Sequence, residues 1–312
     1  MIKRIVIESF KSIVSLPLDC NRINVFIGPP NTGKSNILEA LGYLSYYLSP
    51  KISERIQLNN FVRYMHLSDL YYDNDVSKPI IINFDDYRIN INYDNLKDPS
   101  LFKLGKKIPL VSYSGPKFRY YKFNGNENES IDFKDFLLPP YGANLFYLLL
   151  THKNLREIVQ NFFNPFNLTL GLRQYEAKIE VNKIIDNIII SYPYKNISET
   201  LKRLVLYTIA IETNTNAIII FEEPEIHTFP YYTKFFAERI AIDQEKNNQY
   251  FFSTHNPYLL IPLLEKTKEV NVFATKWENY QTKVYLLNNE NILKYESDVF
   301  FNLDKLIEAN NE

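Results

Sequence analysis

A phosphate-binding pattern, G-x-x-x-x-G-K-[ST], is matched by eight consecutive residues, Gly28-Pro29-Pro30-Asn31-Thr32-Gly33-Lys34-Ser35. Backbone N–H groups in such a loop point inward and form an anion-binding nest at the start of a helix. We expect Lys34 to reach the β- and γ-phosphates of a nucleoside triphosphate, and Ser35 to bind Mg²⁺. The residues predicted to contact the nucleotide here are Gly28, Asn31, Thr32, Gly33, Lys34, Ser35 and Asn36. The alternative interpretation is a turn that matches the pattern by chance.

The segments on both sides of this loop have the periodicity that its chemistry requires. Residues 22–27 are rich in β-branched and aromatic side chains, which predicts a buried strand that ends at Gly28. Beyond the loop, Ile37, Leu41, Leu44 and Leu48 recur at helical spacing. The sequence therefore predicts a strand, a phosphate loop and a helix in that order.

Two acids follow a second apolar segment, 217–221, which is typical of a central strand in a parallel sheet. The carboxyl ends of such strands are where open α/β sheets bind ligands. We expect Glu222 to hold Mg²⁺ and Glu223 to polarise the water that attacks the γ-phosphate. The alternative is a strand that ends in a solvated acidic turn.

A third predicted strand, 250–253, is followed by Thr254-His255-Asn256-Pro257. His255 would then lie at a strand end next to the acids, where its ring can donate a hydrogen bond to the γ-phosphate. A lone histidine is more often a structural residue, and this is the competing interpretation.

Composition limits the class of protein. A net charge of −1 gives no global basic field for nucleic acid, and the single Cys20 forms no internal disulfide, which suits a reducing cytoplasm. The strand-like residues 1–7 predict no signal peptide, and no apolar stretch approaches the roughly 20 residues of a membrane helix. We expect a cytoplasmic protein without a membrane partner.

Taken together, these motifs resemble the ABC-type ATPase heads of the RecF, SMC and OLD group, in particular small stand-alone predicted AAA-type ATPases. The opening segment resembles the first strand of that group and its F-[KR]-S turn, and the resemblance places Lys11 of this turn at the nucleotide. The segments that carry the resemblance are 5–12, 33–41, Tyr141-Gly142-Ala143-Asn144-Leu145, Phe221-Glu222-Glu223-Pro224-Glu225-Ile226-His227 and Ser253-Thr254-His255-Asn256-Pro257.

The resemblance implies an α/β P-loop NTPase with an ABC-type two-lobed head, in which helices flank a mixed central sheet and an antiparallel β lobe is added. One head would span 1–312. Its nucleotide-binding core would comprise 1–70 and 196–290, with an inserted β/helical lobe at 71–195 and a C-terminal helical tail at 291–312. ATP and Mg²⁺ are the expected cofactors, and ATP hydrolysis is the expected reaction.

The sequence departs from this group at two places. The Walker B aspartate is replaced by Glu222, and the signature helix begins with Ser198-Glu199-Thr200, so that Thr200 stands where a glycine is expected. In the group, the signature serine crosses a dimer interface to the γ-phosphate of the partner. The resemblance therefore suggests an ATP-dependent homodimer in which Ser198, Lys202 and Arg203 act in trans. Alternatively, Ser198 is only a helix N-cap.

Residues 103–122 combine basic residues with interleaved aromatic residues and contain no acid. Such a stretch can track the phosphate backbone of DNA and stack its bases. The alternative is a solvated hairpin face with its aromatic residues turned toward the core. For this region we predict a strand pair at 108–113 and 118–123, and further along the chain one helix at 145–163.

Three classes of function remain. The first is a DNA-associated ATPase in repair, replication or the biology and defence of mobile elements. The second is an ATP-switched regulatory or toxin-like module that acts on a separate effector protein. The third, a transporter subunit, is disfavoured because its Leu-Ser-Gly-Gly-Gln signature is missing. OLD-type proteins append a nuclease domain of well over ~100 residues, whereas 57 residues follow His255 (312 − 255), so no nuclease is expected within this sequence.

Overall fold

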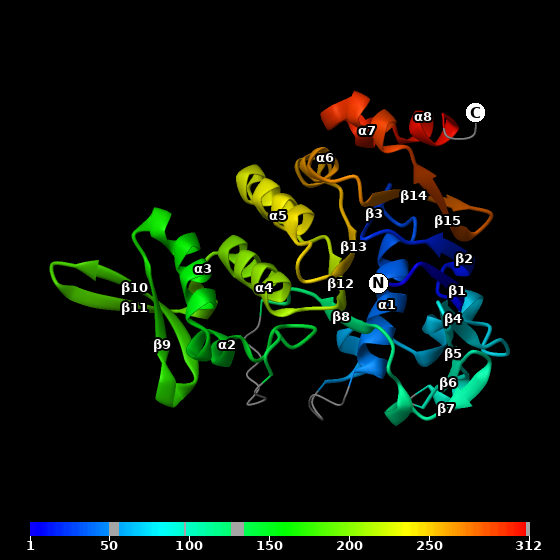
Figure 1. Ribbon diagram of the computed structural model, residues 1–312, viewed down its shortest axis with the longest axis horizontal. Coiled ribbons are helices and arrows are strands. Elements are labelled where there is room, and N and C mark those ends of the chain that lie inside the picture. The colour runs from blue at the N-terminus through cyan, green and yellow to red at the C-terminus, as the bar shows by residue number, and fades with distance from the viewer. Residues whose placement is uncertain (50–55, 97, 126–133, 310–312) are drawn as a thin grey trace.

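The computed structural model describes residues 1–49, 56–96, 98–125 and 134–309. Within these ranges the strands form a mixed central sheet, an antiparallel sheet beside it, and a small antiparallel sheet farther out (Figure 1). The central sheet positions the predicted site. Its strands, in spatial order, are β15 (Gln281–Leu287), β14 (Val270–Glu278), β3 (Ile23–Ile27), β13 (Gln249–Ser253), β12 (Ala217–Glu222) and β8 (Lys117–Tyr121).

Neighbouring strands of the central sheet run parallel, except that β15 runs antiparallel to β14. Both faces of the sheet are covered, which is why β12 is apolar from Ala217 to Phe221 rather than alternating. In β12, Ile218 and Ile220 pack on the side of α1, whereas Ile219 and Phe221 pack on the side of α4, α5 and α6. The bounds of these helices are Lys34–Leu48 for α1, Glu199–Thr213 for α4, Pro230–Ile242 for α5 and Pro257–Lys266 for α6.

The second sheet is antiparallel and shares the α1 side of the core with the central sheet. Ile80–Phe84 and Tyr87–Ile91 form a hairpin with Asp85-Asp86 at its turn, where Asp85 has a φ of 44°. The strands of this sheet, in spatial order, are β2 (Ile13–Asp19), β1 (Arg4–Phe10), β4 (Ile80–Phe84), β5 (Tyr87–Ile91), β6 (Ser100–Lys103) and β7 (Lys106–Ile108).

The third sheet contains β11 (Ile188–Pro193), β10 (Lys178–Ile185) and β9 (Thr169–Arg173), in that spatial order. It projects on the left of Figure 1, with α2 (Leu145–Thr151) and α3 (Lys153–Phe163) at its base. At the tip of the β10–β11 hairpin, Ile184, Ile188 and Ile189 are 62%, 65% and 64% exposed. Within the described chain, β11 has a neighbouring strand on one side only.

The predicted helix over 145–163 is wrong in one respect, because His152 separates it into α2 and α3 with extended dihedral angles (φ −113°, ψ 108°). Side chains compete for the carbonyl groups that a continuous helix would use. Thr151 Oγ1 donates to Tyr147 O at 2.7 Å, and Arg156 Nη1 donates to Leu149 O and Leu150 O at 2.8 Å. These bonds satisfy the end of α2 and allow the chain to turn.

The predicted strand pair at 108–113 and 118–123 is also wrong. Residues Leu110–Ser112 form a 3-10 turn after Pro109, and β8 pairs in parallel with β12 instead of with β7. Phe118, Tyr120 and Tyr121 are at most 1% exposed. A strand whose side chains are buried on both faces gains more from the central sheet than from a two-stranded hairpin.

The C-terminal part of the chain forms β14 and β15, followed by α7 (Asn289–Tyr295) and α8 (Leu303–Glu308). The segment expected to be one insertion, 71–195, contributes strands to all three sheets. Strands β4 to β7 extend the sheet of β1, β8 extends the central sheet, and β9 to β11 form the third sheet.

Gly42 in the middle of α1 allows this helix to lie close to its neighbours, because a methyl group there would lie 2.9 Å from Phe61 O and 3.3 Å from Tyr120 Cδ2. In an exposed helix, alanine would stabilise by about 1 kcal/mol over glycine, but overpacking costs about 1–3 kcal/mol. We expect Gly42→Ala to lower the free energy of unfolding by about 1 kcal/mol in urea titrations. A variant more stable than the parent would contradict this packing.

Candidate nucleotide-binding site

The phosphate loop connects β3 to α1 and is shaped by two glycines. Gly28 has a φ of 146° and Gly33 a φ of 96°, conformations that residues with side chains rarely adopt. A Cβ atom on Gly28 would lie 2.4 Å from Thr275 Oγ1, and one on Gly33 would lie 1.9 Å from Thr282 Oγ1. The loop therefore lies against β14 and β15, and both glycines are required for that contact.

Hydroxyl groups attach the loop to these strands. Thr32 Oγ1 donates to Pro29 O at 2.8 Å and lies 2.6 Å from Thr275 Oγ1. Asn36 Nδ2 donates to Ser12 Oγ at 2.6 Å, which in turn lies 2.6 Å from Thr282 Oγ1. Thr32 and Asn36, predicted to contact nucleotide, thus also hold the loop in place. Asn31 is exposed at the outer surface of the loop with a φ of 61°, and Ser35 is half-buried at the start of α1.

Lys34 is folded back over its own loop. Its Nζ atom donates to Gly28 O and Pro29 O, both at 2.8 Å, and the residue is only 5% exposed. Burial lowers the pKa of this amine to about 8, while the Glu223 carboxylate acts in the opposite direction. An ammonium group held by neutral carbonyls in a poorly solvated loop is prepared to exchange them for an anion.

Glu222 ends β12 and is surrounded by groups that neutralise it. Arg63 Nη2 donates to Glu222 Oε1 at 3.0 Å, Tyr120 OH donates to Oε2 at 3.0 Å, and Lys122 Nζ lies 3.8 Å from Oε2. The side chain of Glu222 is 11% exposed. A carboxylate at this depth requires such compensation. Its proximity to Lys122 follows from the parallel register, in which Tyr121 is opposite Phe221.

A second acid, Glu39, lies one turn after Ser35 in α1 and was missed by the sequence analysis. Its side chain is 1% exposed and pairs with Lys11 and with Arg63, whose Nε atom is 2.5 Å from Glu39 Oε1. Lys11 also donates to Arg63 O at 2.6 Å. Lys11, predicted to contact nucleotide, therefore lies beside α1 in this ion-pair network. The sequence does contain a signal for this site, because Glu39 lies among the apolar residues of a predicted amphipathic helix, where a buried acid requires a cationic partner.

Glu223 and His255 are brought together as expected from neighbouring parallel strands. His255 Nε2 lies 3.1 Å from Glu223 Oε1, and this interaction holds the pKa of Glu223 below its usual value. Glu223 has a φ of 42°, an uncommon conformation for a residue with a side chain. This places its carboxylate on the site side of the strand end, next to the phosphate loop, where Lys34 also acts on it electrostatically.

Glu225 was not predicted to take part in the site, but it supports the loop that carries His255. The residue is 7% exposed, and its Oε1 atom accepts hydrogen bonds from Thr254 Oγ1 at 2.5 Å and from His255 N at 3.1 Å. Its other oxygen, Oε2, is buried without a hydrogen-bond partner. Burial raises the pKa of this carboxyl to about 7 despite these donors.

The predicted signature residues lie at the start of α4. Ser198 is the helix N-cap, because its Oγ atom accepts from Leu201 N at 3.3 Å. Thr200, in the place of glycine, donates to His227 O at 2.6 Å within its own chain. Lys202 donates to Lys195 O at 3.0 Å, and Arg203 pairs with Glu199 at 2.7 Å. Ser198, Lys202 and Arg203 are thus occupied locally, and their action in trans stays a prediction.

The basic stretch 103–122 does not form one face. Phe118, Tyr120 and Tyr121 are buried, as in the alternative interpretation, but in a central strand rather than a hairpin. Arg119 is also buried; it donates to Ser49 Oγ at 2.8 Å and stacks on Phe136. Base stacking on these three aromatic residues is therefore excluded in this structure. The lysines at 103, 106 and 107 lie on β6 and β7.

The residues that the structure describes contain no group of three or more histidine, cysteine or carboxylate side chains arranged to hold a metal ion. In the same part of the chain, no helix has the length and apolar character needed to cross a membrane.

The raised pKa of Glu225 predicts a pH dependence of stability. A carboxyl that binds its proton more tightly in the folded chain stabilises fully below pH 4.5, its ordinary value, and this contribution is lost as the pH rises through about 7. Between pH 4.5 and 8 the unfolding free energy should therefore fall by up to about 3 kcal/mol relative to Glu225→Gln. Parallel denaturant titrations measure the difference, and a constant offset between the two proteins would refute the assignment.

Comparison with known proteins was informative at the level of structure alone. No protein-family model matches the chain, and neither does any curated protein. Among solved structures, an SMC head bound to the C-winged helix domain of ScpA is 13% identical, with a TM-score of 0.57 over 94% of this chain and 99% of that chain.

Two further SMC head domains give similar values. That of Thermotoga maritima is 13% identical, with a TM-score of 0.50 over 92% of this chain and 99% of that chain. An SMC head with an extended coiled coil, bound to the C-terminal domain of ScpA and derived from Pyrococcus furiosus, is 11% identical, with a TM-score of 0.59 over 96% and 99%. The predicted fold class is therefore confirmed: the chain has the fold of an SMC head domain, an ABC-type ATPase head.

Proposed function

We propose that this chain binds and hydrolyses ATP and works as an ATP-gated dimeric switch or clamp. The observation that carries the proposal is the meeting of Lys34, Glu222, Glu223 and His255 at one edge of a parallel sheet. Ligands bind at this edge in open α/β folds, and these side chains are the ones that phosphate transfer to water requires.

Phosphate binding would use the loop and its lysine. The N–H groups of 31–35 would form the anion nest, since Pro29 and Pro30 have none, and Lys34 Nζ would exchange Gly28 O and Pro29 O for the β- and γ-phosphate oxygens. An open cavity of about 760 Å³ begins at Ser12, whose hydroxyl accepts from Asn36 of α1, and it is lined by Lys11, Tyr72, Trp277 and Tyr280 among others. Its aromatic side chains suit the base and ribose of a nucleotide.

The donor set at the acid end fits Mg²⁺, which prefers oxygen ligands. The Ser35 hydroxyl and the Glu222 carboxylate would hold the ion, and Glu222 would have to release Arg63 or Tyr120 from one of its oxygens to do so. When bound, Mg²⁺ neutralises phosphate charge. Glu222 is one methylene longer than the usual aspartate, which requires a slightly different position for the ion.

Glu223 would orient and activate the attacking water. Its lowered pKa keeps it ionised at neutral pH, so that it accepts a hydrogen bond and then the proton of the water. His255 holds this carboxylate through Nε2 and lies where it can also contact the γ-phosphate.

The biological output is proposed to be conformational and to act on a partner. Two of the structurally similar SMC heads are described as bound to a domain of ScpA, which supports a separate effector protein here. Action on DNA in repair, replication or mobile-element defence is also proposed, through the exposed lysines Lys106 and Lys107 of β7, which would contact phosphates without stacking on bases. Failure of duplex DNA at low salt to change the ATPase rate would favour the effector protein alone.

Removing the Lys34 amine should abolish most of the nucleotide affinity. Charge-assisted contacts to phosphate are worth about 1.5–3 kcal/mol, so Lys34→Ala should weaken ATP binding by about tenfold or more in calorimetry. Lys106→Ala, on the exposed strand β7, is the matched control and should bind like the parent. Unchanged affinity of Lys34→Ala would exclude the phosphate-loop assignment.

Glu223→Gln should separate binding from hydrolysis. It preserves the shape of the side chain but removes the base, so ATP should still bind while turnover falls by about 100-fold or more. With ATP and Mg²⁺ this variant should accumulate as a dimer in light scattering, because unhydrolysed nucleotide keeps two heads together. Glu245→Gln, an exposed acid, serves as the control. A monomer at saturating ATP would remove the dimer from the proposal but leave the ATPase.

A further inference from the structure

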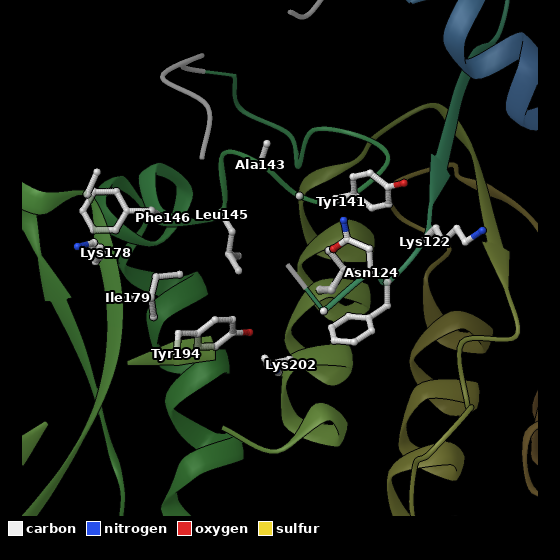
Figure 2. A pocket seen from close by; sticks show the side chains of 15 residues that line it. Lys122, Asn124, Tyr141, Ala143, Leu145, Phe146, Lys178, Ile179, Tyr194 and Lys202 are labelled. Carbon is white, nitrogen blue, oxygen red and sulfur yellow. The ribbon is translucent and has the colours of Figure 1, made fainter. Parts of the chain in front are cut away.

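A second cavity, of about 80 Å³, lies between the central sheet and the third sheet. It is enclosed by residues after β8, the turn before α2, the first residues of β10, and α4 (Figure 2). In this view Leu145, Ile179 and Tyr194 lie on one side of the space, and Asn124 and Lys202 lie on the other. The cavity is separate from the phosphate loop and from the strand ends that carry Glu223 and His255.

One wall is built by the motif Tyr141-Gly142-Ala143-Asn144-Leu145, to which the proposed function gives no role. Gly142 has a φ of 72°, and a Cβ atom there would lie 2.8 Å from Leu206 Cδ1 of α4. Asn144 is fully buried; it accepts from Leu138 N at 2.8 Å and donates to Phe136 O at 3.0 Å. The contact of Gly142 with Leu206 and the hydrogen bonds of Asn144 therefore hold this motif close to α4, where it forms one side of the cavity.

The lining combines apolar walls with positive charge. Phe123, Leu145 and Ile179 supply half-buried apolar surface, and of the described lining residues three are lysines and none is acidic. The side chain of Lys122 points away from the space in Figure 2 and toward Glu222. Lys178 and Lys202 remain at the rim, where they make an ion pair with Glu176 and a hydrogen bond to Lys195 O.

This combination selects a class of ligand. A cavity of about 80 Å³ is smaller than a typical small-molecule site, so a ligand would place only one small group, such as the edge of a ring, between its apolar walls and leave its polar group at the rim. Lys122 and Lys178 are already paired with Glu222 and Glu176, so it is Lys202, which makes no ion pair with a described residue, that favours an anionic group at the mouth. We propose that the cavity binds a small ring-bearing anion, a carboxylate or a phosphate ester, with the ring between Leu145 and Ile179.

Such a ligand would also affect the switch. Lys202 belongs to α4 and is one of the residues assigned above to contact a partner head, so an anion paired with it would keep it within its own chain. This effect on the switch rests on the proposed function, but the binding of the anion does not. The anion is therefore titrated without nucleotide, so that failure of the anion site is distinguishable from failure of the proposed ATP switch.

The test is a titration of the nucleotide-free chain, labelled at isoleucine and leucine methyl groups, with sodium benzoate at constant ionic strength. Saturable shifts of the methyl signals of Ile179, Leu145 and Leu206 are expected in the NMR spectrum. Benzyl alcohol has a similar size and no charge, and it should bind at the same methyl groups more weakly. Absence of saturable shifts at these positions would overturn the proposal.

Two double variants separate the role of charge from that of packing. Lys178→Met with Lys202→Met keeps the apolar stems, and it should weaken benzoate by about fivefold while leaving benzyl alcohol unchanged. Lys106→Met with Lys107→Met removes the same charge from β7, outside the cavity, and should bind both probes like the parent. Equal benzoate affinity in both double variants would refute recognition of the anion by the rim lysines.

Discussion

The parallel alignment of β3 with β13 and β14, extended through β12 and β8, is the constraint on which the site depends. Parallel strands place their carboxyl ends at one edge, so the residues after each strand converge even though they are distant in sequence. The phosphate loop follows β3, the acids follow β12, His255 follows β13 and Lys122 follows β8. The cost of this arrangement is that a central strand such as β12 is apolar on both faces, as Ile218 to Phe221 are.

Burial of charge at that edge is balanced by residues from separate segments. Glu39 of α1 and Glu222 of β12 share Arg63, which comes from the chain beyond α1, while Lys11 of the β1–β2 turn completes the compensation of Glu39. Buried acids of this kind are tolerated only with partners in place. The ion pairs therefore connect α1, β12 and the β1–β2 turn of the second sheet. Because Arg63 contacts both acids, a change in the charge of Glu222 changes the electrostatic balance at Glu39 of α1.

Local patterns predicted the elements that carry the site, because a strand, a glycine-rich loop and an amphipathic helix each leave a signature within a few residues. The pairing of β8 has no such local signature. Its basic and aromatic residues suit a hairpin as well as a strand of the central sheet, and only the pairing with the distant strand β12 decides between these two structures. Arg63 escaped prediction for the same reason, since its two acids are 24 and 159 positions away. The break at His152 depends on side chains that compete for backbone carbonyls, which periodicity does not register.

The projecting hairpin of the third sheet has a consequence for handling the protein. Strand β11 presents a free row of backbone N–H and C=O groups among the described residues, flanked by the exposed side chains of Ile188 and Ile189. Natural sheets commonly protect such edges with charge, proline or a bulge, because uncovered apolar edges recruit further strands. Concentrated samples can therefore aggregate edge to edge through this strand without nucleotide, and particle size alone would not distinguish such aggregates from heads joined by ATP.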